Sequence, residues 1–295
     1  MRFGLVGTGP WAVMAHGPGL RTAEGVELVG VWGRNPQRAR GLADTLGVEA
    51  YDDYAALLAD VEAVAFAVPP DIQAPMAVRA AAAGRHLLLE KPLALTVPAA
   101  QELAGAVAAA GVASVVFFTD RFAPESREWF ATVGQGTGWR GGWTRMLASL
   151  DAPGNPYAES AWRRRYGALW DIGPHALSTL TAVLGPITNV TAVGGVGDLV
   201  HLVVGHESGA TSTASLSLFA PEQASSFETA VWGEGGTAYG PARITPTADS
   251  LAVAATELVA AAESGQPHPA GVELGRRVVE LLADAEAQVQ ARTTA

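Results

Sequence analysis

The sequence predicts an α/β protein with two domains, a doubly wound parallel sheet followed by an α+β domain with a largely antiparallel, open sheet. Over residues 1–120, short apolar runs alternate with longer amphipathic stretches, which is the pattern of parallel strands joined by helical crossovers. After residue 121, strand-like segments alternate apolar and polar residues, and two helical patterns close the chain. We therefore expect one domain over residues 1–120 and a second over residues 121–295.

In the first domain, the apolar runs have the length of buried strands. We expect strands at residues 3–6, 26–31, 63–68, 86–89 and 114–118. Helices are expected from residue 10 onward and at residues 36–46, 72–83 and 98–110. Gly47 and Gly84 follow two of these helical patterns, and glycine commonly ends a helix. Right-handed crossovers between such strands produce a parallel sheet that is covered on both faces.

In the second domain, the strands carry a period of two. Strands are expected at residues 198–205, 211–219 and 227–232, and closing helices at residues 250–262 and 272–291. Thr213, Ser215 and Ser217 alternate with apolar residues, so one face of this sheet should be buried and the other mildly polar. The glycine-rich segment 134–142 is interpreted as a loop that connects strands.

The composition excludes several classes of function. A formal charge of −10 at pH 7 argues against a nucleic-acid surface, which needs clustered Lys and Arg. The absence of cysteine excludes disulfides and thiolate chemistry, and the spacing of the histidines indicates no metal site. The sequence has no apolar stretch long enough for a membrane span, and glycines interrupt its N-terminal apolar run. We expect a soluble, cytoplasmic protein that binds neither nucleic acid nor a membrane.

The turn after the first strand carries the pattern GxGxxA, in the order Gly7, Thr8, Gly9, Pro10, Trp11 and Ala12. The first glycine permits a tight turn, the second lets the backbone approach a pyrophosphate, and the alanine keeps the helix close to the sheet. The helix N-terminus favours the phosphate charge, and a proline is tolerated in the first helical turn. This position in a βαβ unit predicts the dinucleotide-binding turn of a Rossmann domain, and a plain tight turn is the alternative.

The end of the second strand bears on the choice between NAD and NADP. It reads Trp32-Gly33-Arg34-Asn35 and contains no acidic residue for a pair of ribose hydroxyls. Arg34 can instead hold a 2′-phosphate or stack on the adenine, with Gly33 and Asn35 beside it. The sequence therefore favours NADP over NAD, although a solvated surface arginine would give the same pattern.

A second candidate site lies in the stretch GALWDIGPH. Asp171 and His175 are four residues apart and would share one face of a helix, although Pro174 makes that spacing approximate. Taken alone, such a pair is more often a surface ion pair or a helix cap than a catalytic site.

Together with LLLEKPLA at residues 87–94, these motifs resemble the glucose–fructose oxidoreductase/inositol dehydrogenase/MocA family of nicotinamide-dependent oxidoreductases. The resemblance extends over nearly the whole chain, from GTGPWA through AVPP at residues 67–70 to EKP and DxGxH. It implies that Lys91 faces the reacting oxygen of the substrate and the nicotinamide ribose. It also implies that His175 acts as acid/base and that Asp171 lines the substrate pocket.

Elementary chemistry agrees with the roles implied by the resemblance. Oxidising an alcohol by hydride transfer requires removal of the hydroxyl proton, and histidine titrates nearest neutral pH. A lysine stays charged and polarises the oxygen unless burial lowers its pKa. Asp171 could orient His175 or bind a neighbouring hydroxyl, and Glu90 could position Lys91. The residues assigned to the cofactor are those of the glycine turn and of Gly33 to Asn35, with Val68, Pro69, Gln73, Glu90 and Lys91.

Two departures from the family pattern affect the predicted pockets. Gln73 replaces a histidine that many relatives carry there, and an amide can still donate a hydrogen bond to a ribose. The stretch after Trp162-Arg163 is short and lacks the usual glycines. Trp162, Arg163 and Tyr166 are predicted to bind substrate, whereas a salt-bridged or solvated arginine run at residues 163–165 is an equal alternative.

The leading prediction is an enzyme that transfers a hydride between a nicotinamide cofactor and the hydroxyl or carbonyl group of a sugar, cyclitol or similar polyol. Two alternatives stay open: a sensor that binds the cofactor without catalysis, and a hydrolase or lyase that uses the cofactor for transient oxidation. A homodimer or homotetramer through the C-terminal sheet is also expected, because relatives often pair such sheets.

Overall fold

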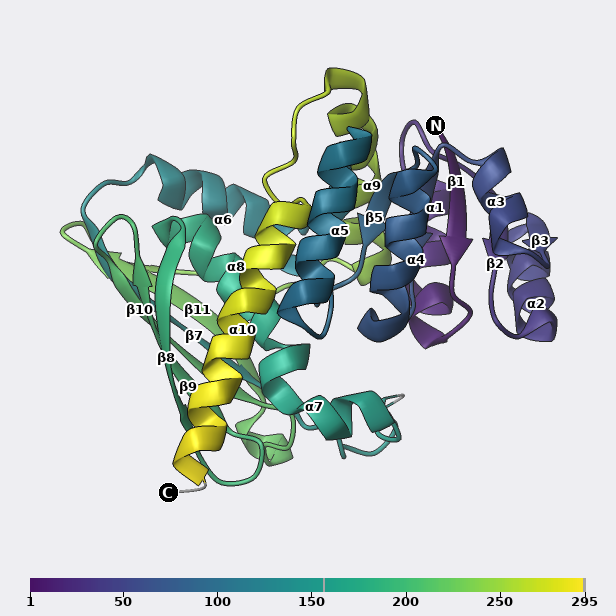
Figure 1. The fold of residues 1–295 in the computed structure, drawn as a ribbon. Helices are drawn as coiled ribbons and strands as arrows, with labels where there is room; N and C mark the ends of the chain where they lie inside the picture. The colour runs from purple at the N-terminus through teal and green to yellow at the C-terminus, as the bar shows by residue number, and fades with distance from the viewer. Residues whose placement is uncertain (156, 294–295) are drawn as a thin grey trace. The chain divides into compact units, whose positions relative to one another are not determined.

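The computed structural model describes residues 1–155 and 157–293, and Figure 1 shows its ribbon. The chain forms two compact units. Residues 1–123 and 245–279 make up the first unit, and residues 124–244 with the chain from residue 280 onward make up the second. Each unit has its own six-stranded sheet. No helix among the described residues is long and apolar enough to cross a membrane.

The sheet of the first unit is parallel throughout, with the strand order β3-β2-β1-β4-β5-β6. Its strands are β1 (Arg2–Val6), β2 (Glu27–Trp32), β3 (Glu49–Tyr51), β4 (Ala63–Phe66), β5 (His86–Leu89) and β6 (Ser114–Val116). The order reverses between β1 and β4, which makes this the switch point where doubly wound sheets bind ligands. The predicted doubly wound parallel sheet is confirmed.

The helices of this unit follow local signals in the sequence. They are η1 (Ala12–His16), α1 (Gly17–Thr22), α2 (Pro36–Leu46), α3 (Tyr54–Asp60), α4 (Pro70–Ala82), α5 (Val97–Ala110), η2 (Thr119–Arg121) and α9 (Thr247–Ser264). The Asn35 side chain accepts hydrogen bonds from Gln37 N and Arg38 N, which begins α2. Gly47 ends the same helix in the left-handed conformation, with φ of 67°. The helix predicted at residues 36–46 is therefore confirmed at both ends.

The boundary of the first unit differs from the predicted one. The break at residue 123 lies close to the expected boundary at residue 120, but residues 245–279 return to the first unit. In α9, Leu251, Ala254 and Leu258 are fully buried, and the helix packs against α1, β5 and β6. Helical periodicity reveals that α9 has an apolar face, but it does not reveal which sheet that face covers.

The second unit contains a mixed sheet with the order β12-β11-β7-β10-β9-β8. Its strands are β7 (Trp139–Leu147), β8 (Ile187–Gly194), β9 (Val200–His206), β10 (Thr211–Ser217), β11 (Ser226–Gly233) and β12 (Gly236–Tyr239). Only the β7–β10 pair is parallel among the strand pairs described, so the predicted, largely antiparallel sheet is confirmed. The helices are α6 (Pro124–Gln135), α7 (Ala161–Asp171), α8 (Gly173–Leu184), the short η3 (Glu222–Ala224) and the second part of α10 (Val272–Thr293).

The glycine-rich segment 134–142 is only partly a loop. Residues 139–142 begin the central strand β7, so the loop prediction is wrong for them. A Cβ on Gly141 would lie 2.7 Å from the Trp232 ring, and one on Gly142 would lie 2.9 Å from the Ala230 carbonyl oxygen. The glycines are present because neighbouring groups of β11 occupy the space of a side chain, and this reason is invisible in the sequence.

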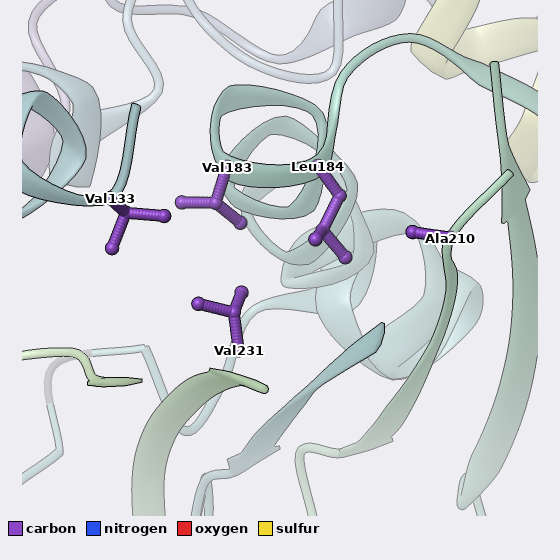
Figure 2. Close-up of a cluster of buried hydrophobic side chains, with 5 residues drawn as sticks. All are labelled: Val133, Val183, Leu184, Ala210 and Val231. Atoms are coloured by element: carbon purple, nitrogen blue, oxygen red, sulfur yellow. The ribbon is translucent and has the colours of Figure 1, made fainter. Parts of the chain in front are cut away.

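The core of the second unit lies between its sheet and the helices that cover it. One buried cluster joins the helices to the sheet, and each of its residues is at most 7% exposed. It contains Val133 of α6, Val183 and Leu184 of α8, Val231 of β11, and Ala210 just before β10. Figure 2 shows these side chains pointing toward one another.

The predicted alternation along β10 also holds over most of the strand. Ala214 and Leu216 are buried, whereas Thr213 is exposed. Ser217 departs from this pattern because it is buried and donates a hydrogen bond of 2.7 Å to Asp198.

Candidate active site

The glycine turn after β1 has a geometry that only glycine allows at its first position. Gly7 has φ of 129°, and a Cβ there would lie 2.3 Å from the carbonyl oxygen of Ala67. Around Gly9, in contrast, no described atom lies within 4 Å of the Cβ position. Ala12 is fully buried and opens η1. The turn therefore packs tightly on its sheet side and leaves an open approach to the backbone at Gly9.

A cavity of about 220 Å³ lies beside this turn in the first unit. Most of the predicted cofactor residues line it. Its walls are Gly7, Thr8, Gly9, Trp32, Gly33, Arg34, Asn35, Arg38, Ala67, Val68, Pro69 and Ile72. Trp32, Arg38, Ala67 and Ile72 were missed by the sequence reasoning. The predicted residues that are not among these walls are Pro10, Trp11, Ala12, Gln73, Glu90 and Lys91.

The residues after β2 form the cationic end of this cavity. Arg34 and Arg38 both line it, and no acidic side chain is among its walls. The Oδ1 atom of Asn35 accepts from Gln37 N at 3.0 Å and from Arg38 N at 3.1 Å, so this oxygen caps α2. Arg34 directly precedes the N-cap residue Asn35, and Arg38 is the third residue of α2, so both guanidinium groups come from the start of this helix. Open backbone at Gly9 and two guanidinium groups fit a phosphate-bearing dinucleotide.

Lys91 lies directly after the buried strand β5. Leu87, Leu88 and Leu89 are fully buried, Glu90 is 8% exposed, and Lys91 is partly exposed. The Lys91–Pro92 peptide bond is cis. The strand thus delivers the lysine to the carboxyl end of a parallel sheet, the edge at which doubly wound proteins bind ligands.

The Glu90 carboxylate is held by two side chains from a distant part of the chain and by the main-chain N–H of the next residue. Its Oε1 atom accepts from the Trp11 indole Nε1 at 2.5 Å and bonds the Nε2 of His16 at 2.8 Å. Its Oε2 atom accepts from the main-chain N–H of Lys91 at 3.3 Å. We expected Glu90 to position Lys91, and this hydrogen bond connects the Glu90 carboxylate to the backbone of Lys91. His16, to which the sequence analysis assigned no role, is fully buried in this cluster.

Gln73 has a different environment from the expected one. Its side chain is fully buried. The Nε2 atom donates to the carbonyl oxygens of Glu90 at 2.8 Å and Leu93 at 3.3 Å. The Oε1 atom accepts from the main-chain N–H of Glu90 at 2.7 Å. A side chain without accessible surface cannot donate to a ribose in this conformation. The predicted ribose contact is therefore corrected: Gln73 holds the backbone around Glu90, because that backbone leaves β5 and needs other partners.

Asp171 and His175 belong to the second unit, on two successive helices. Asp171 ends α7, Ile172 forms the junction, and His175 is the third residue of α8. Ile172 keeps right-handed helical angles, with φ of −106° and ψ of −18°, so the chain bends without unwinding between the two helices. His175 is partly exposed, whereas the Asp171 side chain is 8% exposed.

Of the predicted substrate residues, Arg163 pairs with the Asp171 carboxylate, and the rings of Trp162 and Tyr166 contact each other. Arg163 Nε lies 2.8 Å from Asp171 Oδ2, and the Arg163 guanidinium lies 4.2 Å from the Tyr157 ring centroid. The Trp162 and Tyr166 rings are 5.8 Å apart. Trp162 Nε1 is buried and has no hydrogen-bond partner within the described part of the chain. The ion pair supports the salt-bridged reading of Arg163, and the indole N–H is a donor that a ligand could use.

A break in α7 that sequence reasoning missed sets the direction of the segment leading to Asp171. Gly167 has φ of 61° and ψ of −165°, which interrupts the helix. Directly after the break, Ala168 N donates to Asp198 Oδ2 at 3.1 Å, and the same carboxylate accepts from Leu218 N and Ser217 Oγ. Asp198 thereby caps the turn that follows the break. A positive φ angle at residue 167 requires glycine. The glycine inside this helical pattern is therefore the sequence signal from which the kink could have been predicted.

One compositional signal for Lys91 was also missed. Of the 19 lysines and arginines in the chain, 18 are arginines and Lys91 is the single lysine. Every other Lys or Arg position is an arginine, so this position alone carries a compact ammonium group instead of a planar guanidinium. Among the described residues, no group of three or more His, Asp or Glu side chains could hold a metal ion.

Comparison with known proteins defines the class of the chain. Residues 1–118 match an oxidoreductase family with an NAD-binding Rossmann fold (GFO/IDH/MocA), and residues 136–239 match the GFO/IDH/MocA C-terminal domain. The chain belongs to this family, as the motifs of the sequence indicate, and its first unit is the Rossmann domain.

Two curated relatives carry names that describe sugar chemistry. The dTDP-3,4-didehydro-2,6-dideoxy-alpha-D-glucose 3-reductase of Streptomyces antibioticus is 29% identical over 63% of this chain and 57% of its own. A D-xylose 1-dehydrogenase (NADP(+)) of Haloferax volcanii is 29% identical over 75% of this chain and 71% of its own. Matches to three further curated relatives cover 27% to 30% of those proteins, so the chain spans only part of several relatives.

The fold also recurs in solved structures. An oxidoreductase domain protein from Kribbella flavida is similar over 98% of this chain and 97% of its own, with a TM-score of 0.84 and 25% identity.

Proposed function

We propose that this protein is a NAD(P)-dependent oxidoreductase. It transfers a hydride between the nicotinamide and the CH–OH or C=O group of a sugar, cyclitol or similar polyol. The observation that carries the proposal is the direct connection, within the first unit, between the dinucleotide turn and the lysine-bearing strand end. Trp11 of the GxGxxA turn donates to Glu90, and Glu90 accepts from the backbone N–H of Lys91. A reacting lysine held to the cofactor turn fits hydride-transfer chemistry at a nicotinamide.

The residues would divide the chemistry in the following way. A bound nicotinamide supplies the hydride acceptor or donor. The Lys91 ammonium hydrogen-bonds the reacting oxygen and stabilises the negative charge that develops on it. His175 takes the hydroxyl proton when an alcohol is oxidised and returns it when a carbonyl is reduced. Asp171, already paired with Arg163, binds a neighbouring hydroxyl of the substrate through its carboxylate oxygens.

Cofactor binding would use the cavity beside the glycine turn. The open approach at Gly9 admits the pyrophosphate, and Val68, Pro69 and Ile72 form an apolar wall. Arg34 and Arg38 would hold the 2′-phosphate of NADP, which supports NADP as the preferred cofactor over NAD. The name of the Haloferax relative, which includes NADP(+), supports the same preference.

The substrate class rests on the relatives and on the aromatic residues of α7. Both named relatives act on sugars according to their names. Trp162 and Tyr166 offer ring faces to the apolar C–H side of a sugar, and the Trp162 indole N–H is a donor for one of its oxygens. We place Trp162, Arg163 and Tyr166 around the substrate, with Arg163 acting through its ion pair with Asp171.

A substrate panel tests the proposal. The protein is incubated with aldoses, ketoses, cyclitols and nucleotide-linked sugars, each with NAD, NADP, NADH and NADPH, and the nicotinamide absorbance is followed. We expect turnover with at least one polyol and a higher kcat/KM with NADP than with NAD. Binding of the dinucleotides with no change in absorbance across the whole panel, by an enzyme that remains folded, would contradict hydride transfer to polyols.

We also propose that the protein works in the cytoplasm as a homodimer or homotetramer through the sheet of the second unit. Val203 and Trp232, on the face that carries Thr213, are 52% and 46% exposed, which supports burial of this face against a second copy. Light scattering on the wild type and Val203→Glu measures the assembly. A monomeric mass for the wild type at micromolar concentration rules out this interface.

A further inference from the structure

We propose that Trp11 and His16 are positioning residues for Lys91, acting through the Glu90 carboxylate. The inference rests on the proposed role of Lys91; it gives Trp11 of the glycine turn a second role and adds His16, which no motif assigns. Both side chains reach the same oxygen, Glu90 Oε1, at 2.5 Å and 2.8 Å. They come from positions 79 and 74 residues away from Glu90 in the chain. The dinucleotide turn and the lysine are therefore linked through one side chain.

An irregular helix brings Trp11 and His16 to the same oxygen. Five residues along an α-helix correspond to a rotation of about 140° beyond one full turn, which would put the two side chains on different faces. The segment Ala12–His16 is instead a π-helix, in which Gly17 N donates to the Ala12 carbonyl oxygen. The wider turn brings residues five apart onto one face.

Pro18 provides a local cause for the π-turn. Its ring has no N–H to donate to the carbonyl of Met14, four residues earlier, and a proline ring collides with that carbonyl in a regular α-helix. The widened turn at Ala12–His16 lies directly before this proline, where a regular α-helix could not continue without that conflict. The sequence around Pro18 therefore creates the geometry that aims His16 at Glu90.

Each polar group of Glu90, in the backbone and in the carboxylate, forms a hydrogen bond. Its backbone N–H and carbonyl bond the Gln73 amide, Oε1 bonds Trp11 and His16, and Oε2 accepts from Lys91 N. The carboxylate cannot rotate without breaking one of these bonds. It thus fixes the backbone N–H of the residue that carries the ammonium.

The tautomer of His16 follows from its surroundings. Nε2 must carry the hydrogen that is donated to the carboxylate oxygen. Nδ1 is buried and has no hydrogen-bond partner in the part of the chain that the structure describes. His16 consequently contributes one donor, so a glutamine, which also carries an N–H donor, can replace it, whereas a leucine cannot.

The test uses the single lysine of the chain as a label. Selective incorporation of ¹⁵N-lysine gives one backbone amide resonance, that of Lys91, in the full-length protein. We compare its chemical shift and hydrogen-exchange rate in the wild type, Trp11→Phe, His16→Leu, His16→Gln and Glu90→Gln, each with and without NADPH. His206→Leu is the matched control. Like His16, His206 is buried and hydrogen-bonded, in this case through both ring nitrogens, but it lies in the second unit.

We expect Trp11→Phe, His16→Leu and Glu90→Gln to shift the Lys91 resonance and to raise its exchange rate about tenfold or more. We expect kcat to fall about 10- to 100-fold, with the NADPH dissociation constant changing far less, because a misplaced lysine slows the chemical step. His16→Gln should recover most of both losses. His206→Leu should lower the melting temperature and leave the Lys91 resonance unchanged.

Wild-type values of the Lys91 shift and exchange rate in all three disruptive variants would overturn the inference, whatever the activities. A loss in His16→Gln as large as in His16→Leu would overturn the role of the donated hydrogen bond. Failure of the proposed function appears separately, as wild-type turnover by Lys91→Met. The resonance of Lys91 reports its position whether or not turnover requires the side chain.

Discussion

Replacing Gly7 and Gly9 by alanine should separate folding from cofactor binding. At residue 7, a Cβ would lie 2.3 Å from the Ala67 carbonyl oxygen and 2.8 Å from its carbonyl carbon, on a backbone with φ of 129°. The backbone conformation costs an L-residue about 1–3 kcal/mol. Displacing the Ala67 backbone costs about as much again, since this neighbour is not a flexible side chain. Gly7→Ala should therefore lower the free energy of unfolding by about 2–6 kcal/mol.

Gly9 is the matched control within the same turn. No described atom lies within 4 Å of its Cβ position, and this position borders the cavity. Gly9→Ala should leave the free energy of unfolding within about 0.5 kcal/mol of the wild type. It should nevertheless weaken dinucleotide binding about tenfold or more, because the methyl group occupies the approach of the pyrophosphate.

Urea unfolding followed by circular dichroism measures the stability of both variants, and calorimetric titration with NADPH measures the affinity. The reasoning about the turn is refuted if Gly7→Ala unfolds like the wild type. The assignment of the cavity to the dinucleotide fails if Gly9→Ala binds NADPH with wild-type affinity.

Three further predictions concern the cavity and the second unit. Arg34→Ala should weaken NADP binding about 10- to 100-fold and NAD binding much less, since one charge-assisted contact to a phosphate is lost; equal losses for both cofactors, measured by titration, would contradict the phosphate contact. Arg163→Met should cost about 2 kcal/mol of unfolding free energy by removing the guanidinium from the buried Asp171 carboxylate, and Arg163→Met with Asp171→Leu should recover most of it; a larger loss in the double variant would contradict this pairing. Burial lowers the pKa of His206 below its usual 6.5, so the folded state favours the neutral ring, and the stability that this ring contributes is present above pH 6.5 and lost as the pH falls. Unfolding free energies measured between pH 7 and pH 5 should therefore fall less steeply in His206→Gln, by up to about 1.4 kcal/mol per pH unit; parallel pH profiles would contradict this assignment.

Much of the fold is encoded in local patterns. The strand β5 and the helix α2 begin and end where the apolar runs, Pro36 and Gly47 predict. The same local logic identified the glycine turn, because Gly7 needs a conformation that other residues avoid. Lys91 was found because the EKP motif that follows a buried strand resembles that of the GFO/IDH/MocA family.

The remaining features depend on contacts between distant segments. The glycines of β7 respond to Trp232 and Ala230, about ninety residues later in the chain, so the segment resembled a loop. The His16–Glu90 bond spans 74 residues and requires a π-turn, which helical periodicity does not predict. Gln73 was assigned to the ribose because its amide chemistry suits either partner, and only its burial reveals that it bonds the Glu90 backbone.

The central claim is that Lys91 supports hydride transfer next to a bound nicotinamide. Its most direct measurement is the single-turnover rate of hydride transfer in Lys91→Met and the wild type, with the best polyol of the panel and saturating NADP. The account predicts a rate lowered about 10²- to 10⁴-fold with an unchanged dissociation constant for NADP. A Lys91→Met enzyme that transfers hydride at the wild-type rate would contradict it.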